Sequence, residues 1–190
     1  LLKPNIESVE KMVIAAYYGW YSGTGRHWGG VTETAASETV NYPIFGPYDS
    51  MDTDTIRNHI SLAQTSGVDG FACSWWGQDT YEDEAFRRLL HACNETGFKA
   101  TIYYEPVRNG VILTSDQVVD ELLYVLARYQ SSRGFLRCWG KPVIFVFAPA
   151  GAGDPMFWSR VQEGLIDGFG KVILVGDFRD PLFLKCFDGV

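Results

Sequence analysis

The chain has 190 residues, 46% of them hydrophobic, and a formal net charge of −7. This is enough apolar material for one globular domain, residues 1–190, and the 16 scattered basic residues argue against a nucleic-acid partner. No run approaches the roughly 20 apolar residues that span a bilayer, so we expect no membrane span.

Five short apolar runs are typical of buried strands. They cover residues 13–18, 68–75, 99–104, 142–147 and 171–175. Helical patterns follow the first four runs, over residues 54–66, 82–96, from 115 onward and 155–169. Asp52 or Thr53 is the expected cap of the first helix and Ser115 that of the third, while Gly67 and Gly97 close the first two.

Continuous apolar strands that alternate with helices predict a parallel sheet. Two α/β architectures fit, an open doubly wound sheet and a (β/α)8 TIM-type barrel. The first usually carries G-x-G-x-x-G after its opening strand, whereas residues 23–25 lie in a polar loop with no helix after it. A complete barrel needs about 250 residues. We therefore expect the N-terminal five to six strands of a barrel, the sixth starting at Phe187, with its C-terminal part missing.

Residues 22–50 form a long irregular stretch after the first strand. Connections of this length in compact domains are usually lids or binding loops. We therefore expect a lid here. The chain starts at Leu1 rather than Met, which would fit a removed leader and a secreted or extracytoplasmic protein; the sequence does not fix the compartment or the oligomeric state.

The pair Glu105-Pro106 ends the third strand. Proline stops ladder pairing, so the chain must turn out of the sheet there and leave the Glu105 side chain at the rim. In alternating strand and helix proteins this rim is where chemistry is usually done. Asp177 follows the fifth strand, and a pair of carboxylates on one rim would suit glycoside hydrolysis. Asp177 can equally be a solvated loop residue or a helix cap.

Aromatic side chains cluster after the first two strands. They can stack on sugar rings or simply fill the core. The four cysteines are single residues without C-x-x-C spacing, which favours buried free thiols. H-E-x-x-H, G-x-S-x-G and P-loop motifs do not occur, so we expect neither a metal site nor a cofactor.

Several motifs in one order resemble glycoside hydrolase family 99, which includes endo-α-1,2-mannosidases and endomannanases. They lie at residues 17–21, 26–28, 42–43, 46–52, 59, 67–70, 74–77 and 105–106. The resemblance implies a (β/α)8 barrel and an endo-acting, retaining hydrolase of α-mannosides. It also implies that the substrate's own 2-hydroxyl, deprotonated by a carboxylate, replaces an enzyme nucleophile.

The resemblance gives Glu105 the role of this catalytic carboxylate. The residues expected to bind the sugar are Tyr18, Trp20, His27, Trp28, Tyr48, His59, Trp75, Trp76 and Tyr104. His27 and Trp28 would lie on the lid. The expected partner is an oligosaccharide or polysaccharide.

The family is expected to place a second glutamate on the loop after the same strand, but residues 107–110 read Val-Arg-Asn-Gly. Arg108 cannot act as a general acid at neutral pH. Asp177, or an acid beyond Val190, would then supply the proton. The alternative is a non-catalytic glycan-binding or structural surface domain of the same fold.

Overall fold

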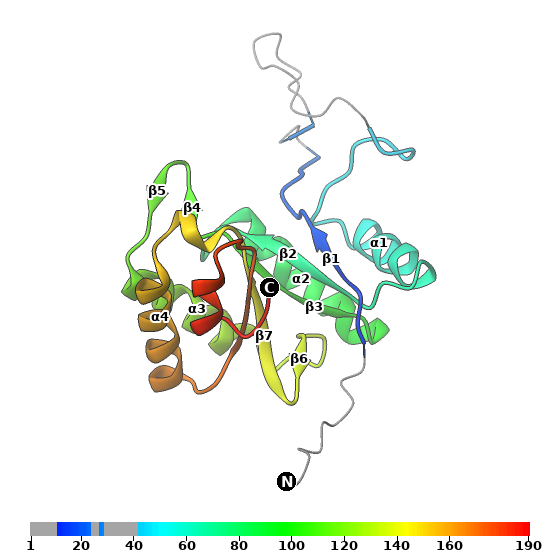
Figure 1. The fold of residues 1–190 in the computed structure, drawn as a ribbon. Helices are drawn as coiled ribbons and strands as arrows, with labels where there is room; N and C mark the ends of the chain where they lie inside the picture. Colours follow the sequence, from blue (N-terminus) through cyan, green and yellow to red (C-terminus); the bar gives the residue numbers. More distant parts are fainter. Residues whose placement is uncertain (1–10, 24–26, 29–41) are drawn as a thin grey trace, which may run out of the picture.

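A computed structural model describes residues 11–23, 27–28 and 42–190, and its centre is a five-stranded parallel sheet (Figure 1). The strands lie in the order β1, β2, β3, β7 and β8. Their bounds are Ile14–Tyr17, Gly70–Trp75, Lys99–Tyr104, Lys141–Val146 and Ile173–Gly176. Each of the five predicted runs therefore overlaps a strand.

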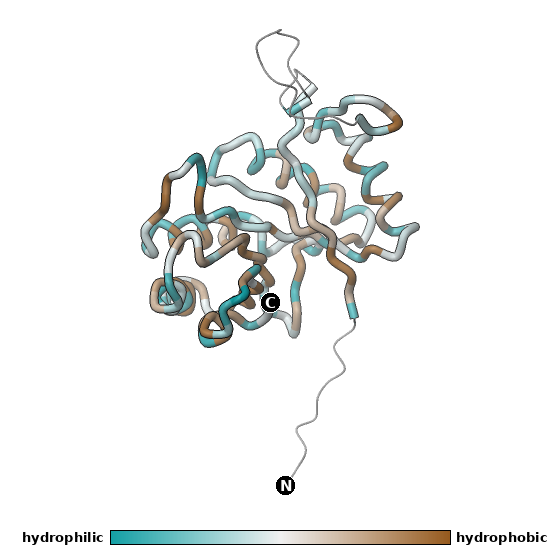
Figure 2. Tube along the Cα trace, turned by 45° about the horizontal axis from the view of Figure 1, so that its top comes forward, coloured by the Kyte–Doolittle hydropathy of each residue, from teal (hydrophilic) through white to brown (hydrophobic). Residues whose placement is uncertain are grey.

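Four helices connect the strands and pack on the outer face of the sheet (Figure 1). They are α1 (Thr53–Thr65), α2 (Tyr81–Thr96), α3 (Ser115–Tyr129) and α4 (Pro155–Gly168). Hydrophobic and hydrophilic positions alternate along their coils (Figure 2). One side of each helix thus faces the sheet and the other faces solvent.

Three short strands were not predicted. An antiparallel hairpin, β4 (Val107–Arg108) and β5 (Val111–Ile112), extends from the rim directly after β3. Strand β6 (Arg137–Cys138) pairs with the start of β7. Two 3₁₀ turns, η1 (Pro149–Gly151) and η2 (Pro181–Lys185), follow β7 and β8.

The structure confirms one predicted helix cap and corrects another. Asp52 caps α1 as expected, because its carboxylate accepts from the backbone N of Thr55 at 2.9 Å. The cap of α3 is Thr114, not Ser115: its hydroxyl accepts from the backbone N of Gln117, and the Gln117 side chain accepts from the backbone N of Thr114. This reciprocal capping box satisfies two backbone donors, which a cap at Ser115 would not do.

The predicted sixth strand is present as a single bridge. Gly189 pairs in parallel with Val175, and the backbone N of Gly176 donates to the Gly189 carbonyl at 3.1 Å. Within the described residues β1 and β8 do not pair with each other, so the sheet stays open. The parallel α/β arrangement is confirmed, and the closed barrel is not formed by these residues.

Side-chain alternation divides the sheet into two faces. On the outer face the core contains Phe71, Cys73 and Trp75 from β2, Ala100, Ile102 and Tyr104 from β3, and Ile144 and Val146 from β7. The intervening residues, such as Ser74 and Tyr103, point to the inner face. Any residue one step past Tyr104 on β3 must therefore face inward.

A buried carboxylate joins α2 to the sheet and to α3. Asp83 is 4% exposed and accepts from Trp75 Nε1 at 2.9 Å, from the Tyr124 hydroxyl at 2.6 Å and from the Tyr129 hydroxyl at 2.8 Å. The backbone N of Asp79 is a fourth donor, at 3.2 Å. Four donors satisfy a charge that would otherwise be costly to bury.

Cys73, Cys93 and Cys186 are buried free thiols, as expected, whereas Cys138 is half-buried. Burial raises the pKa of Cys73 and of Cys93 to about 12, so neither forms a thiolate near neutral pH. In the part of the chain that the structure describes, no helix has the length and apolar character needed to cross a membrane.

Asp83→Ala should lower the free energy of unfolding by about 3 kcal/mol or more, because it leaves Trp75, Tyr124 and Tyr129 without an acceptor. Urea unfolding followed by far-UV circular dichroism measures this. The matched control is Glu163→Ala on the exposed face of α4, which should change stability by no more than about 0.5 kcal/mol. Equal effects of the two substitutions would contradict a structural role for the Asp83 network.

Candidate functional site: the carboxyl rim of the sheet

The candidate site lies where the carboxyl ends of the parallel strands meet. Trp76, Glu105 and Asp177 follow β2, β3 and β8, and Tyr18 follows β1. All four are an even number of residues from an inward-facing position, so they share the inner face and the rim above it. This edge is the one at which α/β proteins hold their ligands.

Glu105 is held at the rim by its backbone and its side chain. Its N donates to the Trp75 carbonyl at 3.2 Å, which continues the pairing of β3 with β2 by one residue. Its carboxylate Oε1 accepts from Ser74 Oγ at 3.0 Å. The residue is 8% exposed, so Glu105 is nearly buried at the rim.

Ser74 is fully buried, and its hydroxyl links Trp76 to Glu105. Trp76 Nε1 donates to Ser74 Oγ at 2.9 Å. Because an indole N–H can only donate, the Ser74 oxygen acts as acceptor there and its single hydrogen is directed to Glu105. These two hydrogen bonds fix the orientation of both the Trp76 ring and the Glu105 carboxylate.

The pKa of Glu105 is raised, mainly because burial disfavours the charged carboxylate. The hydrogen bond from Ser74 and the positive charge of Arg108 act in the opposite direction. A carboxylate with a raised pKa accepts a proton more readily than a solvated one, which suits general acid–base chemistry near neutral pH.

The Arg108 side chain lies on the outer, helix-covered face of the sheet, and not on the inner face with Glu105. Its Nε donates to the Glu105 backbone carbonyl at 2.9 Å, and its guanidinium binds Glu121 of α3 at 2.8 and 2.5 Å. It also stacks over Trp75 and Tyr104, on the helix side. Arg108 is thus part of the packing beneath the rim.

Gly77 makes room for that arginine. A Cβ at position 77 would lie 2.6 Å from an Arg108 guanidinium nitrogen, and the φ of +119° is one that other residues rarely adopt. Glycine at this position therefore allows the β2–α2 loop and the β4–β5 hairpin to pack against each other.

Asp177 lies at the same level of the rim as Glu105, two strands away. Tyr104 pairs with Val146 and Val146 with Gly176, so the next residues on β3 and β8 are Glu105 and Asp177. At a strand spacing of about 4.8 Å their Cα atoms are roughly 10 Å apart. Asp177 is exposed.

Tyr103 lies close enough to both Glu105 and Asp177 for their charges to affect its pKa. Burial, the charges of Asp177 and Glu105, and a hydrogen bond to Asp177 raise the pKa of Tyr103 to about 12. Its ring meets Phe145 and Phe147 edge-on at 6.4 and 5.7 Å. The phenol is therefore a protonated hydrogen-bonding group on the inner face near both acids.

An aromatic row borders Glu105. Tyr18 stacks on Trp20 with ring centroids 4.6 Å apart, and Trp20 contacts His27 at 5.4 Å and Trp76 at 6.2 Å. Tyr18 is 44% exposed. The structure thus brings together four predicted sugar-binding residues, Tyr18, Trp20, His27 and Trp76, beside the Ser74–Glu105 pair.

Two predicted sugar-binding residues lie in the core instead. Trp75 and Tyr104 are 0% exposed, and their polar atoms bind Asp83 and Glu121. Strand alternation explains the difference, because these residues are the outward-facing neighbours of Ser74 and Glu105. They support the rim from below.

Three further predicted residues gather beside α1, away from Glu105. Trp28 is 5% exposed, and its Nε1 donates to the Tyr48 carbonyl at 2.7 Å. The Tyr48 ring meets Trp28 at 4.8 Å and His59 at 4.9 Å. The predicted lid of residues 22–50 is described only at 22–23, 27–28 and 42–50; its remainder lies outside the described residues.

The prediction from sequence did not assign a role to Ser74 or Tyr103. Tyr103 could have been found from the period-two pattern, since it lies two residues before Glu105 on the same strand. Ser74 could not, because only its pairing with Tyr103 on the neighbouring strand places it on the inner face. Among residues 11–23, 27–28 and 42–190, no three His, Cys, Asp or Glu side chains gather in a way that could hold a metal ion.

A parallel sheet with outer helices and polar groups at its carboxyl edge is the architecture of TIM-barrel-related α/β proteins. Residues 29–162 match Glycosyl hydrolase family 99, and the chain belongs to this family. The match includes β2, β3 and the Ser74–Glu105 pair.

Similar proteins agree with this assignment. The family 99 endo-α-mannosidase from Bacteroides thetaiotaomicron superposes with a TM-score of 0.78 at 22% identity, covering 96% of this chain and 61% of that chain. A glycoside hydrolase-like protein gives a TM-score of 0.61 at 15% identity, covering 93% of this chain and 55% of that chain. The mouse glycoprotein endo-α-1,2-mannosidase-like protein is 22% identical over an alignment of 154 residues, and the match covers 65% of this chain and 33% of that protein. The chain thus spans only part of the length of each relative.

Ser74→Ala should raise the pKa of Glu105 further, because it removes a hydrogen bond that favours the ionised carboxylate. A ¹³C NMR titration of the Glu105 carboxyl group measures this. Ser61→Ala, on the exposed side of α1, is the control and should leave the titration unchanged. A pKa that stays constant or falls in Ser74→Ala would show that the pair does not hold the carboxylate ionised.

Proposed function

We propose that the chain is a carbohydrate-active domain that binds an α-mannoside-type oligosaccharide or polysaccharide across the rim and hydrolyses it with retention. Glu105 is the essential carboxylate in this proposal. Family membership supports the class of reaction. The observation that carries the assignment of Glu105 is its nearly buried carboxylate, hydrogen-bonded to Ser74 and bordered by Trp76 at the carboxyl edge of the sheet.

The chemistry assigned to Glu105 is removal of a proton from a sugar hydroxyl. Burial raises its pKa, so it is a stronger base than a solvated carboxylate and retains enough charge, through Ser74, to act. Deprotonation of the substrate's 2-hydroxyl would let that oxygen displace the leaving group, and subsequent attack by water would give net retention. The faces of Trp20 and Trp76 would position the apolar side of a sugar ring beside it.

Asp177 is the proposed proton donor. It lies on the same rim, at a Cα separation of roughly 10 Å from Glu105, and inward-pointing carboxylates at that spacing can approach the 5 to 10 Å over which acid pairs work. Its contact with Tyr103 would position it.

The second candidate is a glycan-binding domain without turnover. One observation favours it: the hairpin directly after Glu105 presents Arg108, which is bound to Glu121, and no acid. The two candidates agree on binding at the rim and differ in hydrolysis.

Glu105→Gln should reduce hydrolysis of an α-1,2-linked manno-oligosaccharide on the order of 1,000-fold and leave its affinity nearly unchanged, because the amide keeps an acceptor for Ser74 but cannot take a proton. Product release measures the first quantity and calorimetric titration the second. Glu163→Gln, exposed on α4, is the control. Full activity in Glu105→Gln would refute its role, and binding without hydrolysis by the unmodified chain would favour the second candidate.

Asp177→Asn should reduce the same hydrolysis on the order of 100-fold or more, with the largest loss for substrates whose leaving group needs protonation. An aryl mannoside with an acidic leaving group should be affected much less, since it leaves without a proton. Asp167→Asn, exposed on α4, is the matched control. Equal losses for both substrates would show that Asp177 is not the proton donor.

A further inference from the structure

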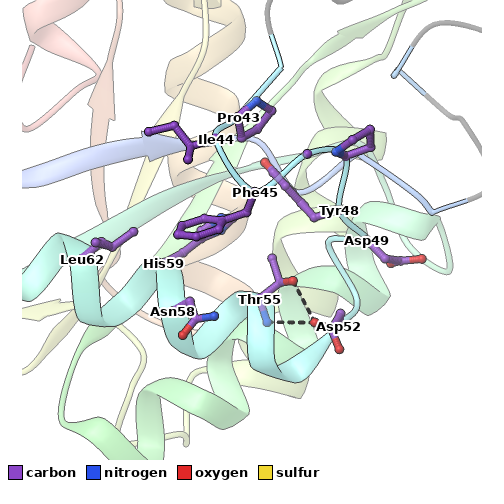
Figure 3. A pocket seen from close by; sticks show the side chains of 12 residues that line it. Pro43, Ile44, Phe45, Tyr48, Asp49, Asp52, Thr55, Asn58, His59 and Leu62 are labelled. Carbon is purple, nitrogen blue, oxygen red and sulfur yellow. Dashed lines mark hydrogen bonds between the residues drawn. The ribbon is translucent and has the colours of Figure 1, made fainter.

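A cavity lies away from the rim, between α1 and the loop that precedes it (Figure 3). Its volume is about 600 Å³, which is within the range of small-ligand pockets. Figure 3 shows the loop arching over α1, with Phe45 in front of His59 and with Asn58 and Thr55 along the helix. None of the roles proposed for Glu105 and Asp177 uses this cavity.

A tight turn presents an aromatic ring at the mouth of the cavity. The backbone N of Gly46 donates to the Pro43 carbonyl at 2.8 Å, so Ile44 and Phe45 are the central residues of a β-turn. Gly46, the last residue of the turn, has a φ of +79°, which glycine adopts readily. Phe45 is 93% exposed, and Pro43 and Pro47 restrict the turn on both sides. An apolar ring is thus held in place facing solvent, where it gains nothing from burial.

The floor of the cavity offers hydrogen-bonding groups. His59 Nδ1 lies 3.0 Å from the Tyr17 hydroxyl, and burial lowers the pKa of His59, so its ring is neutral at neutral pH. With Tyr17 as donor, His59 Nε2 carries the hydrogen and is a donor itself. The Asn58 side-chain amide has no hydrogen-bond partner among the described residues.

The lining favours a neutral, amphipathic ligand. Asp49 and Asp52 lie at one end of the cavity. Burial acts to raise the pKa of Asp49, but hydrogen bonds from neighbouring groups outweigh it, and hydrogen bonds also lower the pKa of Asp52, so both are ionised acceptors. Among the residues that the structure describes, no Lys or Arg lines the cavity, which disfavours an anion. A ring with an apolar face and several hydroxyls would match the aromatic groups on one side and the amide, imidazole and carboxylates on the other.

Contacting rings connect this cavity to the rim. The Tyr48 ring, which contacts His59, lies 5.6 Å from Tyr21. Tyr21 lies 6.4 Å from Trp20, and Trp20 lies 6.2 Å from Trp76. The aromatic row beside Glu105 therefore continues to the wall of the cavity beside α1.

We infer that this cavity is an accessory saccharide site, and that one glycan chain occupies both it and the rim. The occupancy of both sites rests on the proposed function at the rim, whereas saccharide binding in the cavity does not. Joining two weak sites by one ligand raises the overall affinity well above that of either alone, so the arrangement selects long glycans over short ones.

The test is an NMR titration of the 190-residue chain with α-1,2-mannobiose and with the corresponding mannotetraose. The Asn58 side-chain amide reports on the cavity, and the Trp76 indole N–H reports on the rim. Phe45→Ala should weaken the mannobiose affinity read at Asn58 on the order of 10-fold and remove the advantage of the tetraose, without changing the mannobiose affinity read at Trp76. Because Phe45 is exposed, this variant should fold normally.

Trp139→Ala is the matched control. Trp139 is an exposed aromatic on the β6–β7 turn, at the opposite end of the sheet, and its removal should change neither reporter. A shift at Trp76 alone would overturn the accessory site and leave the proposed function standing. A shift at Asn58 alone would support the accessory saccharide site and count against the rim and against joint occupancy. No shift at either reporter would overturn both.

Discussion

Successive side chains of a β-strand point to opposite faces of the sheet. At the end of β3 this alternation places Tyr104 on the outer face and its neighbour Glu105 on the inner face. Tyr104 enters the core under α3, where its hydroxyl binds Glu121 at 2.7 Å. Tyr103 and Glu105 face inward. The same alternation on β2 buries Trp75 and turns Ser74 and Trp76 to the inner face. The contact between Ser74 and Glu105 depends on this register between β2 and β3.

The register also explains how the nearly buried carboxylate of Glu105 is held at the rim. Glu105 loses solvation at the rim, which raises its pKa, and Ser74 compensates in part. The Ser74 hydroxyl can do so because Trp76 occupies its acceptor side. Arg108 pairs with Glu121 on the outer face and bonds only the backbone carbonyl of Glu105, and its positive charge lowers the pKa of Glu105 from there.

Much of the fold could be predicted because local patterns decide it. The five strand runs and four helices follow from apolar periodicity and from caps such as Asp52. Glu105 could be placed at the rim because a proline follows it. The β4–β5 hairpin, the Thr114 cap and the burial of Trp75 could not be predicted. For Trp75 the reason is that an aromatic residue at a strand end suits either face of the sheet, and only pairing with β3 settles which face it takes. The cavity beside α1 depends on a tertiary contact between the 43–48 turn and the helix, which no local pattern encodes.

A crystal structure of the chain with bound α-1,2-mannobiose would test the central claim most directly. A sugar hydroxyl should lie within hydrogen-bonding distance of the Glu105 carboxylate, with the ring against Trp20 or Trp76. A saccharide bound only elsewhere, or a Glu105 side chain enclosed by protein with no path for a ligand, would contradict the assignment of the rim as the glycan site.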